Sequence, residues 1–116
     1  MNENNFHDKL KLLMDDYVNK VYDSSANFPK EEIFGVTSQL RRASLSVILN
    51  YIEGYARRRP AVYKNFLETA FGSLKESKYL LYFSFKRKYL NDVAYKELLA
   101  INDQIGAMLW GMLKKM

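Results

Sequence analysis

Residues 91–115, NDVAYKELLAINDQIGAMLWGMLKK, carry the pattern that decides the fold. Asn91 is a good N-cap residue, Asp92 lies in the first turn, and Lys114 and Lys115 bring positive charge to the C-terminal end. Apolar residues recur at alternating steps of four and three, at Ala94, Leu98, Ile101, Ile105, Met108 and Met112. This spacing places them on one side of an α-helix, as in the seam between packed helices. The segment therefore predicts a helix that buries one face against other helices.

Three earlier segments show the same periodicity. The first runs from about Phe6 to Tyr22, and its apolar stripe is Phe6, Leu10, Leu13, Tyr17 and Val21. The second opens at residues 28–32 and ends near residues 57–59, with the stripe Ile33, Val36, Leu40, Ala43, Val47, Tyr51 and Gly54. The third runs from Pro60 to about Lys88, and its main stripe is Tyr63, Leu67, Ala70, Leu74, Ser77, Leu81 and Phe85. Pro29 and Pro60 fit the first turns of helices.

Four amphipathic segments joined by short connectors predict an all-α, antiparallel up-and-down four-helix bundle that spans residues 1–116 as one domain. The scarcity of Gly and Pro, with 5 and 2 residues, argues against a turn-rich β architecture. We expect the first helix to be shorter than the second and third.

Composition excludes several classes of protein. The chain has no Cys, so it can form neither a disulfide framework nor a thiolate metal site. The polar N-terminal residues 1–5 have no apolar stretch typical of a signal peptide, and no apolar run reaches the ~20 residues of a membrane span. We therefore expect a cytoplasmic protein without membrane contact.

Positive charge is unevenly distributed. The formal net charge is +5, but residues 1–32 contribute −3 and residues 33–116 contribute +8. The basic region formed by residues 33–116 favours polyanionic partners such as RNA or DNA, because cationic side chains neutralise phosphates and release counterions.

Several motifs occur in order between residues 28 and 80. Phe28-Pro29 precedes Glu32, and Leu40, Arg41-Arg42-Ala43 and Asn50 precede Glu53-Gly54; Phe66-Leu67, Gly72-Ser73-Leu74 and Glu76 follow. This order resembles the 23S rRNA intervening-sequence proteins, in which the pattern reads FP-x-x-E, L-x-x-Q-x-R-R-A, S-I-P-x-N-I-x-E-G and F-L-x-x-A-x-G-S-x-x-E. Ile48 stands where that pattern has Pro, so a kink expected there would be absent.

The resemblance implies a four-helix bundle that forms a homo-oligomer, in several members a pentamer. Relatives of this bundle act as accessory proteins of reverse transcriptases in diversity-generating retroelements, where they bind nucleic acid and the polymerase. A reverse transcriptase is therefore one partner that the resemblance implies.

The second segment carries a polar row beside its apolar stripe. The row is Gln39, Arg42, Ser46, Asn50 and Glu53, at steps of three, four, four and three. One interpretation is a hydrogen-bonded network between helices or subunits, in which a partly buried Arg42 and Glu53 need each other or comparable partners. The other is a row that contacts a ligand or nucleic acid.

Basic residues gather at two helix ends. We single out Arg57, Arg58, Arg59 and Lys64 as the leading candidates for nucleic-acid binding, followed by Arg41, Arg87 and Lys88. In an antiparallel pair the residue 57–59 and 86–88 clusters lie at opposite ends, so only an oligomer would multiply them into a larger surface. Tyr55 and Tyr63 beside the first cluster could stack on bases or could simply pack. The alternative is that the charges complement helix dipoles and aid solubility.

Aromatic residues of the third segment, together with Trp110, are interpreted as core or subunit interface. They are Phe66, Phe71, Tyr79, Tyr82, Phe83 and Phe85.

Catalysis has little support. His7 is the only His and lies near a terminus expected to fray, so a His-based catalytic or metal site is not expected. No phosphate-binding Gly-rich motif and no Glu-x-x-His pair occurs. We expect no catalytic residues, no metal and no cofactor. Three functions remain open: an oligomeric scaffold associated with RNA, a protein-interaction module without direct nucleic-acid contact, or a bundle that binds a small molecule in a deep core pocket.

Overall fold

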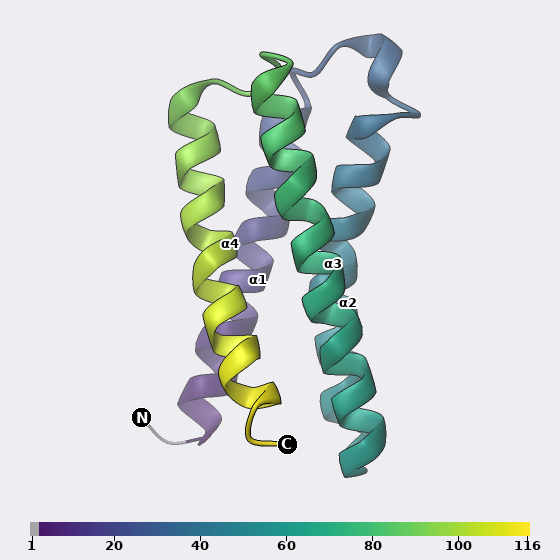
Figure 1. Ribbon diagram of the computed structural model, residues 1–116, viewed down its shortest axis with the longest axis vertical. Coiled ribbons are helices and arrows are strands. Elements are labelled where there is room, and N and C mark those ends of the chain that lie inside the picture. The colour runs from purple at the N-terminus through teal and green to yellow at the C-terminus, as the bar shows by residue number, and fades with distance from the viewer. Residues whose placement is uncertain (1–2) are drawn as a thin grey trace.

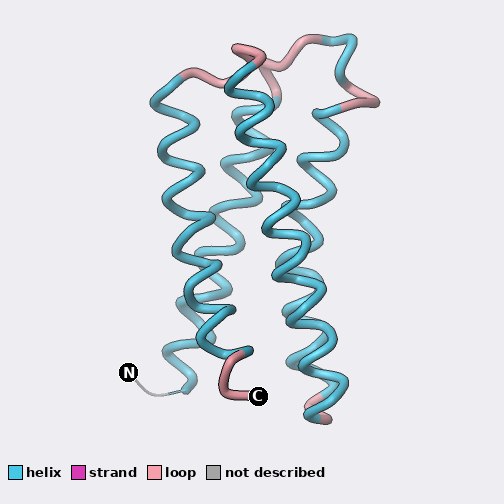
Figure 2. Tube along the Cα trace, in the orientation of Figure 1, coloured by secondary structure: helices cyan, strands magenta, loops and turns pink. Residues whose placement is uncertain are grey.

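The computed structural model describes residues 3–116; Met1 and Asn2, part of the polar N-terminal stretch, lie outside the described residues. Four long helices span the molecule: α1 (Glu3–Ser25), α2 (Val36–Arg57), α3 (Pro60–Lys86) and α4 (Asp92–Leu113). A short 3₁₀ helix, η1 (Lys30–Glu32), lies between α1 and α2. The helices alternate in direction and are joined by short loops (Figures 1 and 2). The predicted all-α, up-and-down four-helix bundle is confirmed.

The helices form a square. α1 packs on α2, α2 on α3, α3 on α4, and α4 on α1, whereas the described backbones of the two diagonal pairs do not approach closely. The predicted stripes face the centre of this square, with Ile33 as an exception. The innermost side chains include Leu10, Val47, Leu74 and Ile105, none of which is measurably exposed. Burial of such stripes supplies most of the stability of helices that would be marginal in isolation.

The predicted caps and ends are mostly accurate. Asn91 caps α4, because its side-chain oxygen accepts a 2.8 Å hydrogen bond from the Ala94 amide. Ile48 lies inside an unbroken α2, so the kink that Pro would cause is absent.

The entry to α2 differs from the prediction. The helix begins at Val36 rather than near Phe28, and Ile33 is exposed instead of lying in the buried stripe. Phe28 anchors the connector in the core, and the extended ψ of 140° at Pro29 directs the chain into η1. Glu32 accepts from the Val36 amide at 3.4 Å and from the Tyr89 hydroxyl at 2.9 Å. The connector is therefore an ordered, capped turn, which periodicity alone did not reveal.

The expectation that the first helix is shorter than the next two was right for α3, which has 27 residues, and wrong for α2. α1 has 23 residues and α2 has 22. Polar residues such as Asn4, Asp23 and Ser24 extend α1 beyond its apolar stripe at both ends.

Helices α2 and α3 approach closely where α2 carries Gly54. A Cβ placed on Gly54 would lie 2.7 Å from Phe66 Cβ and 3.3 Å from a ring carbon of Tyr63. Further along α2 and α3, the hydroxyl groups of Ser46 and Ser73 form a hydrogen bond of 2.9 Å. Small residues on both helices therefore allow the two backbones to pack tightly into one long hairpin.

Candidate nucleic-acid interface

Three consecutive arginines form the turn between α2 and α3, which we call the arginine tip (Arg57–Arg59). α2 ends at Arg57, Arg58 follows with a left-handed backbone (φ 64°), and Arg59 is the N-cap of α3. The Arg59 amide donates to the Arg57 carbonyl at 2.8 Å, which closes the turn. All three residues are exposed, and the tip projects past the ends of α1 and α4 (Figure 1).

The charge of the tip is only partly neutralised. Arg57 forms a 2.9 Å ion pair with Glu53 one turn earlier in α2. Among residues 3–116, Arg58, Arg59 and Lys64 take part in no ion pair, and the first turn of α3 contains no acidic residue. The partial negative charge at the end of α2 favours Arg57 and Arg58, but Arg59 lies at the positive N-terminal end of α3. Dipole complementarity therefore accounts for part of the cluster and leaves Arg59 unexplained.

The second basic cluster lies at the opposite end of α3, as the antiparallel arrangement predicts. Lys86 ends α3, and Arg87 and Lys88 follow it, all exposed. Lys88 also has a left-handed backbone, with φ 67°. Within one subunit the two clusters are separated by the length of the bundle (Figure 1).

Arg41 lies apart from both clusters. Its Nε donates to Ser25 Oγ at 2.7 Å, another guanidinium nitrogen donates to the Tyr22 carbonyl at 3.3 Å, and the group lies 4.7 Å above the Tyr22 ring. The last turn of α1 has no basic residue of its own, so Arg41 supplies the positive charge that this helix end favours. These contacts give Arg41 a structural role.

The polar row on α2 divides into two parts. The Asn50 amide donates to the Ser46 carbonyl at 2.8 Å and to Ser46 Oγ at 2.9 Å, and Ser46 reaches Ser73 on α3. Gln39, Arg42 and Glu53 are exposed, and Glu53 pairs with Arg57. In the single subunit Arg42 and Glu53 are therefore not partly buried, and a network of this row between subunits stays a prediction.

The end of the bundle beside the tip contains an aromatic cluster that sequence reasoning underestimated. His7 is buried rather than frayed, and its Nδ1 hydrogen-bonds the Tyr51 hydroxyl. Its ring lies 4.5 Å from that of Tyr55, which in turn meets Tyr63 edge to face at 6.2 Å. Tyr55 and Tyr63 are thus packed, half-buried side chains, not rings displayed for stacking.

Several residues expected in the core or an interface are exposed. Trp110 is 56% exposed, Tyr79 is 62% exposed and Tyr82 is 47% exposed. The core interpretation was therefore wrong for these three, and the interface interpretation stays a prediction. Phe66, Phe71, Phe83 and Phe85 are half-buried.

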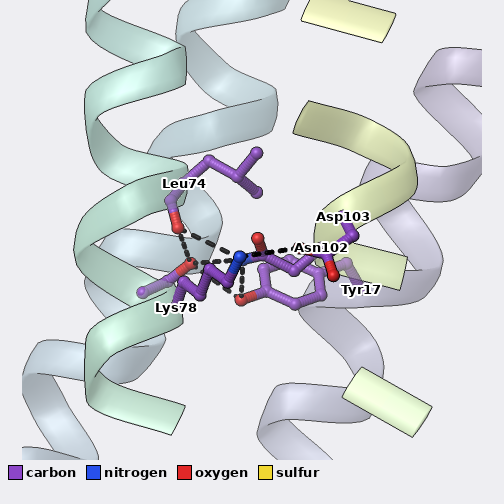
Figure 3. A network of polar contacts seen from close by, with 6 residues as sticks. Tyr17, Leu74, Lys78, Asn102 and Asp103 are labelled. Atoms are coloured by element: carbon purple, nitrogen blue, oxygen red, sulfur yellow. Dashed lines mark hydrogen bonds and ion pairs between the residues drawn. The ribbon is translucent and has the colours of Figure 1, made fainter. Parts of the chain in front are cut away.

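A buried polar network occupies the centre of the bundle (Figure 3). The Asn102 amide of α4 donates to the Tyr17 hydroxyl at 3.0 Å and to the Leu74 carbonyl at 3.2 Å. The Tyr17 hydroxyl lies 2.7 Å from Ser77 Oγ, and the Ser77 hydroxyl donates a hydrogen bond to the Leu74 carbonyl. Burial raises the pKa of the Tyr17 phenol, and the hydrogen bonds from Ser77 and Asn102 oppose this in part.

This network ties α1, α3 and α4 together without an open face for a ligand. Its partners are 0–1% exposed. Asn102 was missed from the sequence, although it lies four residues after Leu98 and four before Gly106, on the buried side of α4. A fully bonded network of this kind fixes helix register.

No group of three or more His, Cys, Asp or Glu residues that could hold a metal ion occurs in the described part of the chain. Within residues 3–116, no helix is long and apolar enough to cross a membrane.

Comparison with known families decides the classification. The family described as 23S rRNA-intervening sequence protein matches residues 12–111, which is most of the chain. The chain belongs to the 23S rRNA-intervening sequence protein family. The resemblance found in the motifs of residues 28–80 is therefore confirmed.

Solved structures support the fold of this 23S rRNA-intervening sequence protein. One is a crystal structure of a protein with unknown function from the S23 ribosomal protein family of Bacteroides thetaiotaomicron. It aligns with a TM-score of 0.81 at 19% identity, over 90% of this chain and 98% of that one. At this identity the likeness shows the fold alone. None of the curated proteins searched matches this chain.

Proposed function

We propose that the protein is a non-enzymatic, basic scaffold of the cytoplasm that assembles into a homo-oligomer and binds RNA through phosphate contacts. Arg58, Arg59 and Lys64 form the centre of the proposed surface, with Arg57 beside them. Arg87 and Lys88 form a second, weaker surface, and Arg41 is left out because its guanidinium is held by α1.

The observation that carries this proposal is the arginine at position 58. Its φ of 64° lies in the left-handed region, where a residue other than Gly costs roughly 1–2 kcal/mol. Gly is the residue that best fits such a position after a helix. Arg58 therefore carries its charge on a strained backbone where Gly would fit better, and Arg59 places a second charge at a helix N-terminus, where the helix dipole disfavours it. Phosphate binding would account for the position of these charges.

Oligomerisation is supported by an apolar stripe on the outer side of α2. Leu45, Leu49 and Ile52 recur at steps of four and three, and their side chains are 37–54% exposed. A helix with apolar residues on both its inner and outer faces is typical of one that packs against another subunit. In a ring or pentamer, each arginine tip would be repeated around the axis, which would multiply the positive potential.

The test is RNA binding as a function of salt. For single strands the slope of log K against log salt is about −0.7 per neutralised phosphate. Replacing Arg57, Arg58 and Arg59 with Gln should therefore reduce the slope by about two units if all three contact phosphates. A variant with Gln at Lys86, Arg87 and Lys88 removes the same charge at the opposite end, where the second, weaker surface lies, and it should reduce the slope by less.

Binding lost equally in both variants would show that net charge alone is responsible and would reject the tip as the site. An absence of RNA and DNA binding by the unaltered protein at about 50 mM salt would reject the nucleic-acid function altogether.

A second candidate is a protein-interaction module, with a reverse transcriptase as one possible partner and no direct nucleic-acid contact. Phe34 favours it, because this side chain is 95% exposed in the connector before α2, next to the exposed Ile33. Such residues are typical of protein interfaces. Copurification with a partner polymerase that is lost in Phe34→Ser, while RNA binding is absent, would favour this candidate.

A further inference from the structure

An exposed aromatic pair lies between α3 and α4. Trp110 of α4 and Phe71 of α3 have ring centroids 6.0 Å apart with planes tilted by 34°. Trp110 is the only Trp in the chain and more than half of its surface is exposed. Burial of a tryptophan side chain is strongly favourable, so the exposure of this indole ring needs an explanation.

Two hollows flank this pair, one on each side along the helices. The first, of about 340 Å³, is lined by Lys64, Gly72, Leu113 and Lys114 together with the two aromatic rings. The second, of about 430 Å³, is lined by Lys75, Gly106 and Ala107 together with the same rings. A Cβ on Gly72 would meet no atom within 4 Å. Small residues therefore leave room for a flat group to reach the indole from either side.

The rim of these hollows is positively charged. Lys64, Lys75 and Lys114 take part in no ion pair within residues 3–116, and Lys75 Nζ lies 5.1 Å above the Phe71 ring. Two carboxylates also line the hollows. Asp103 is paired with Lys78 of α3 at 2.9 Å, and Glu68 lies between Lys64 and the aromatic pair along α3. Lysines outnumber carboxylates, which favours an anionic occupant.

We infer that this groove binds an unpaired base of a single-stranded nucleic acid, stacked on Trp110, with the neighbouring phosphates held by Lys64, Lys75 and Lys114. The inference rests on the proposed function and deepens it. Aromatic side chains beside a basic track are the usual features of single-strand binding surfaces. A duplex keeps its base faces covered by stacking and could offer the groove only its backbone.

The groove begins at Lys64, five residues after the arginine tip ends at Arg59. Lys64 lies one turn beyond Pro60, the first residue of α3, so a strand that contacts Arg58 and Arg59 would next meet the first hollow. Between Lys64 and Lys75 the path along α3 covers roughly 16 Å at 1.5 Å per residue. The tip would supply salt-dependent attraction, and the groove would supply a preference for unpaired bases.

Trp110 itself provides the measurement, because its fluorescence reports on this groove alone. The probes are a single-stranded oligoadenylate of about 12 nucleotides, within the site sizes usual for single-strand binders, and an abasic sugar–phosphate chain of equal length. We expect the oligoadenylate to quench the fluorescence and the abasic chain to leave it unchanged. Trp110→Ala should weaken oligoadenylate binding about tenfold and abasic binding not at all.

Tyr79→Ala is the matched control, because Tyr79 is a similarly exposed aromatic residue of α3 outside both hollows; its subunit number is measured in parallel, since Tyr79 is also a candidate interface residue. It should bind both probes as the unaltered protein does. Trp110→Phe, which keeps a ring, should retain most of the affinity lost in Trp110→Ala. Thermal unfolding followed by circular dichroism checks that each variant folds.

Three results would overturn the inference. Oligoadenylate binding with unchanged Trp110 fluorescence would reject the groove while leaving the arginine tip as the site. An equal loss of affinity for both probes in Trp110→Ala would reject base stacking. A change of subunit number in Trp110→Ala would show that the groove is a contact between copies. If neither probe binds at low salt, the proposed function fails together with the inference.

Discussion

The close packing of α2 on α3 makes Gly54 the position most sensitive to one added methyl group. In Gly54→Ala the new Cβ would lie 2.7 Å from Phe66 Cβ and 3.4 Å from the Tyr63 carbonyl oxygen. Neither atom can rotate away, because one is attached directly to the backbone and the other is part of it. The helices must therefore separate, at a cost of typically 1–3 kcal/mol for overpacking.

Helix propensity acts in the opposite direction. Ala is favoured over Gly in a helix interior by about 1 kcal/mol. Gly72→Ala makes the same substitution in the middle of α3, where the new Cβ meets nothing, so it should stabilise the protein by about 1 kcal/mol. Gly54→Ala should be less stable than Gly72→Ala by about 1–3 kcal/mol, the overpacking cost alone.

Urea unfolding followed by circular dichroism measures the difference, at one fixed protein concentration because subunit dissociation could contribute. The corresponding gap in Tm is roughly 4–12 °C for a chain of this size. Equal stabilities of the two variants would refute the close approach of α2 and α3 at Gly54.

Three further predictions concern the core and the tip. Asn102→Ala removes the amide that joins three helices and should cost about 2–3 kcal/mol in urea unfolding; a loss below about 0.5 kcal/mol would contradict the network. Because burial raises the pKa of Tyr17 above its usual value of 10.0, the folded state holds that proton more tightly than the unfolded state. The free energy of unfolding should therefore fall as pH rises from about 10 toward the raised pKa, by up to about 1.4 kcal/mol per pH unit. Tyr17→Phe should lack this part of the pH dependence, and an equal pH dependence in both proteins would contradict the raised pKa. Arg58→Gly should raise stability by about 1 kcal/mol while weakening RNA binding, whereas Arg59→Gly should weaken binding without the gain, since Arg59 has φ −69°; an Arg58→Gly variant that binds RNA normally would count against the tip.

The helices themselves could be predicted from the sequence because burial follows their periodicity. Leu98, Ile101 and Ile105 were placed on one face by spacing alone, and the structure buries all three. Asn91 could be identified as an N-cap because capping depends on the residue itself and its immediate neighbours.

The connector before α2 could not be predicted, because its geometry depends on contacts distant in sequence. Ile33 continues the apolar period, yet Phe28 is the side chain that is buried in the core, and Glu32 is held by Tyr89 of the α3–α4 connector, 57 positions along the chain. Periodicity also cannot distinguish an exposed residue at the edge of a stripe from a buried one. Trp110, one residue after the buried Leu109, was misjudged for this reason.

The candidate site was predictable in composition and only partly in geometry. The run of three arginines before Pro60 shows which end of the hairpin is basic, but not that Arg58 adopts a left-handed backbone or that Arg41 is engaged by Ser25. The groove beside Trp110 combines residues of α3 and α4 about 40 positions apart, so it becomes visible only when the two helices are paired. Whether the tip and the groove bind RNA stays a prediction.

The most direct test of the central proposal is the solution mass of the protein by light-scattering chromatography, with and without single-stranded RNA at about 50 mM salt. We predict a discrete homo-oligomer whose mass increases when RNA is added, and no such increase when Arg57, Arg58 and Arg59 are all replaced, with the oligomer intact. A monomer, or an oligomer whose mass is the same with and without RNA, would contradict the proposal.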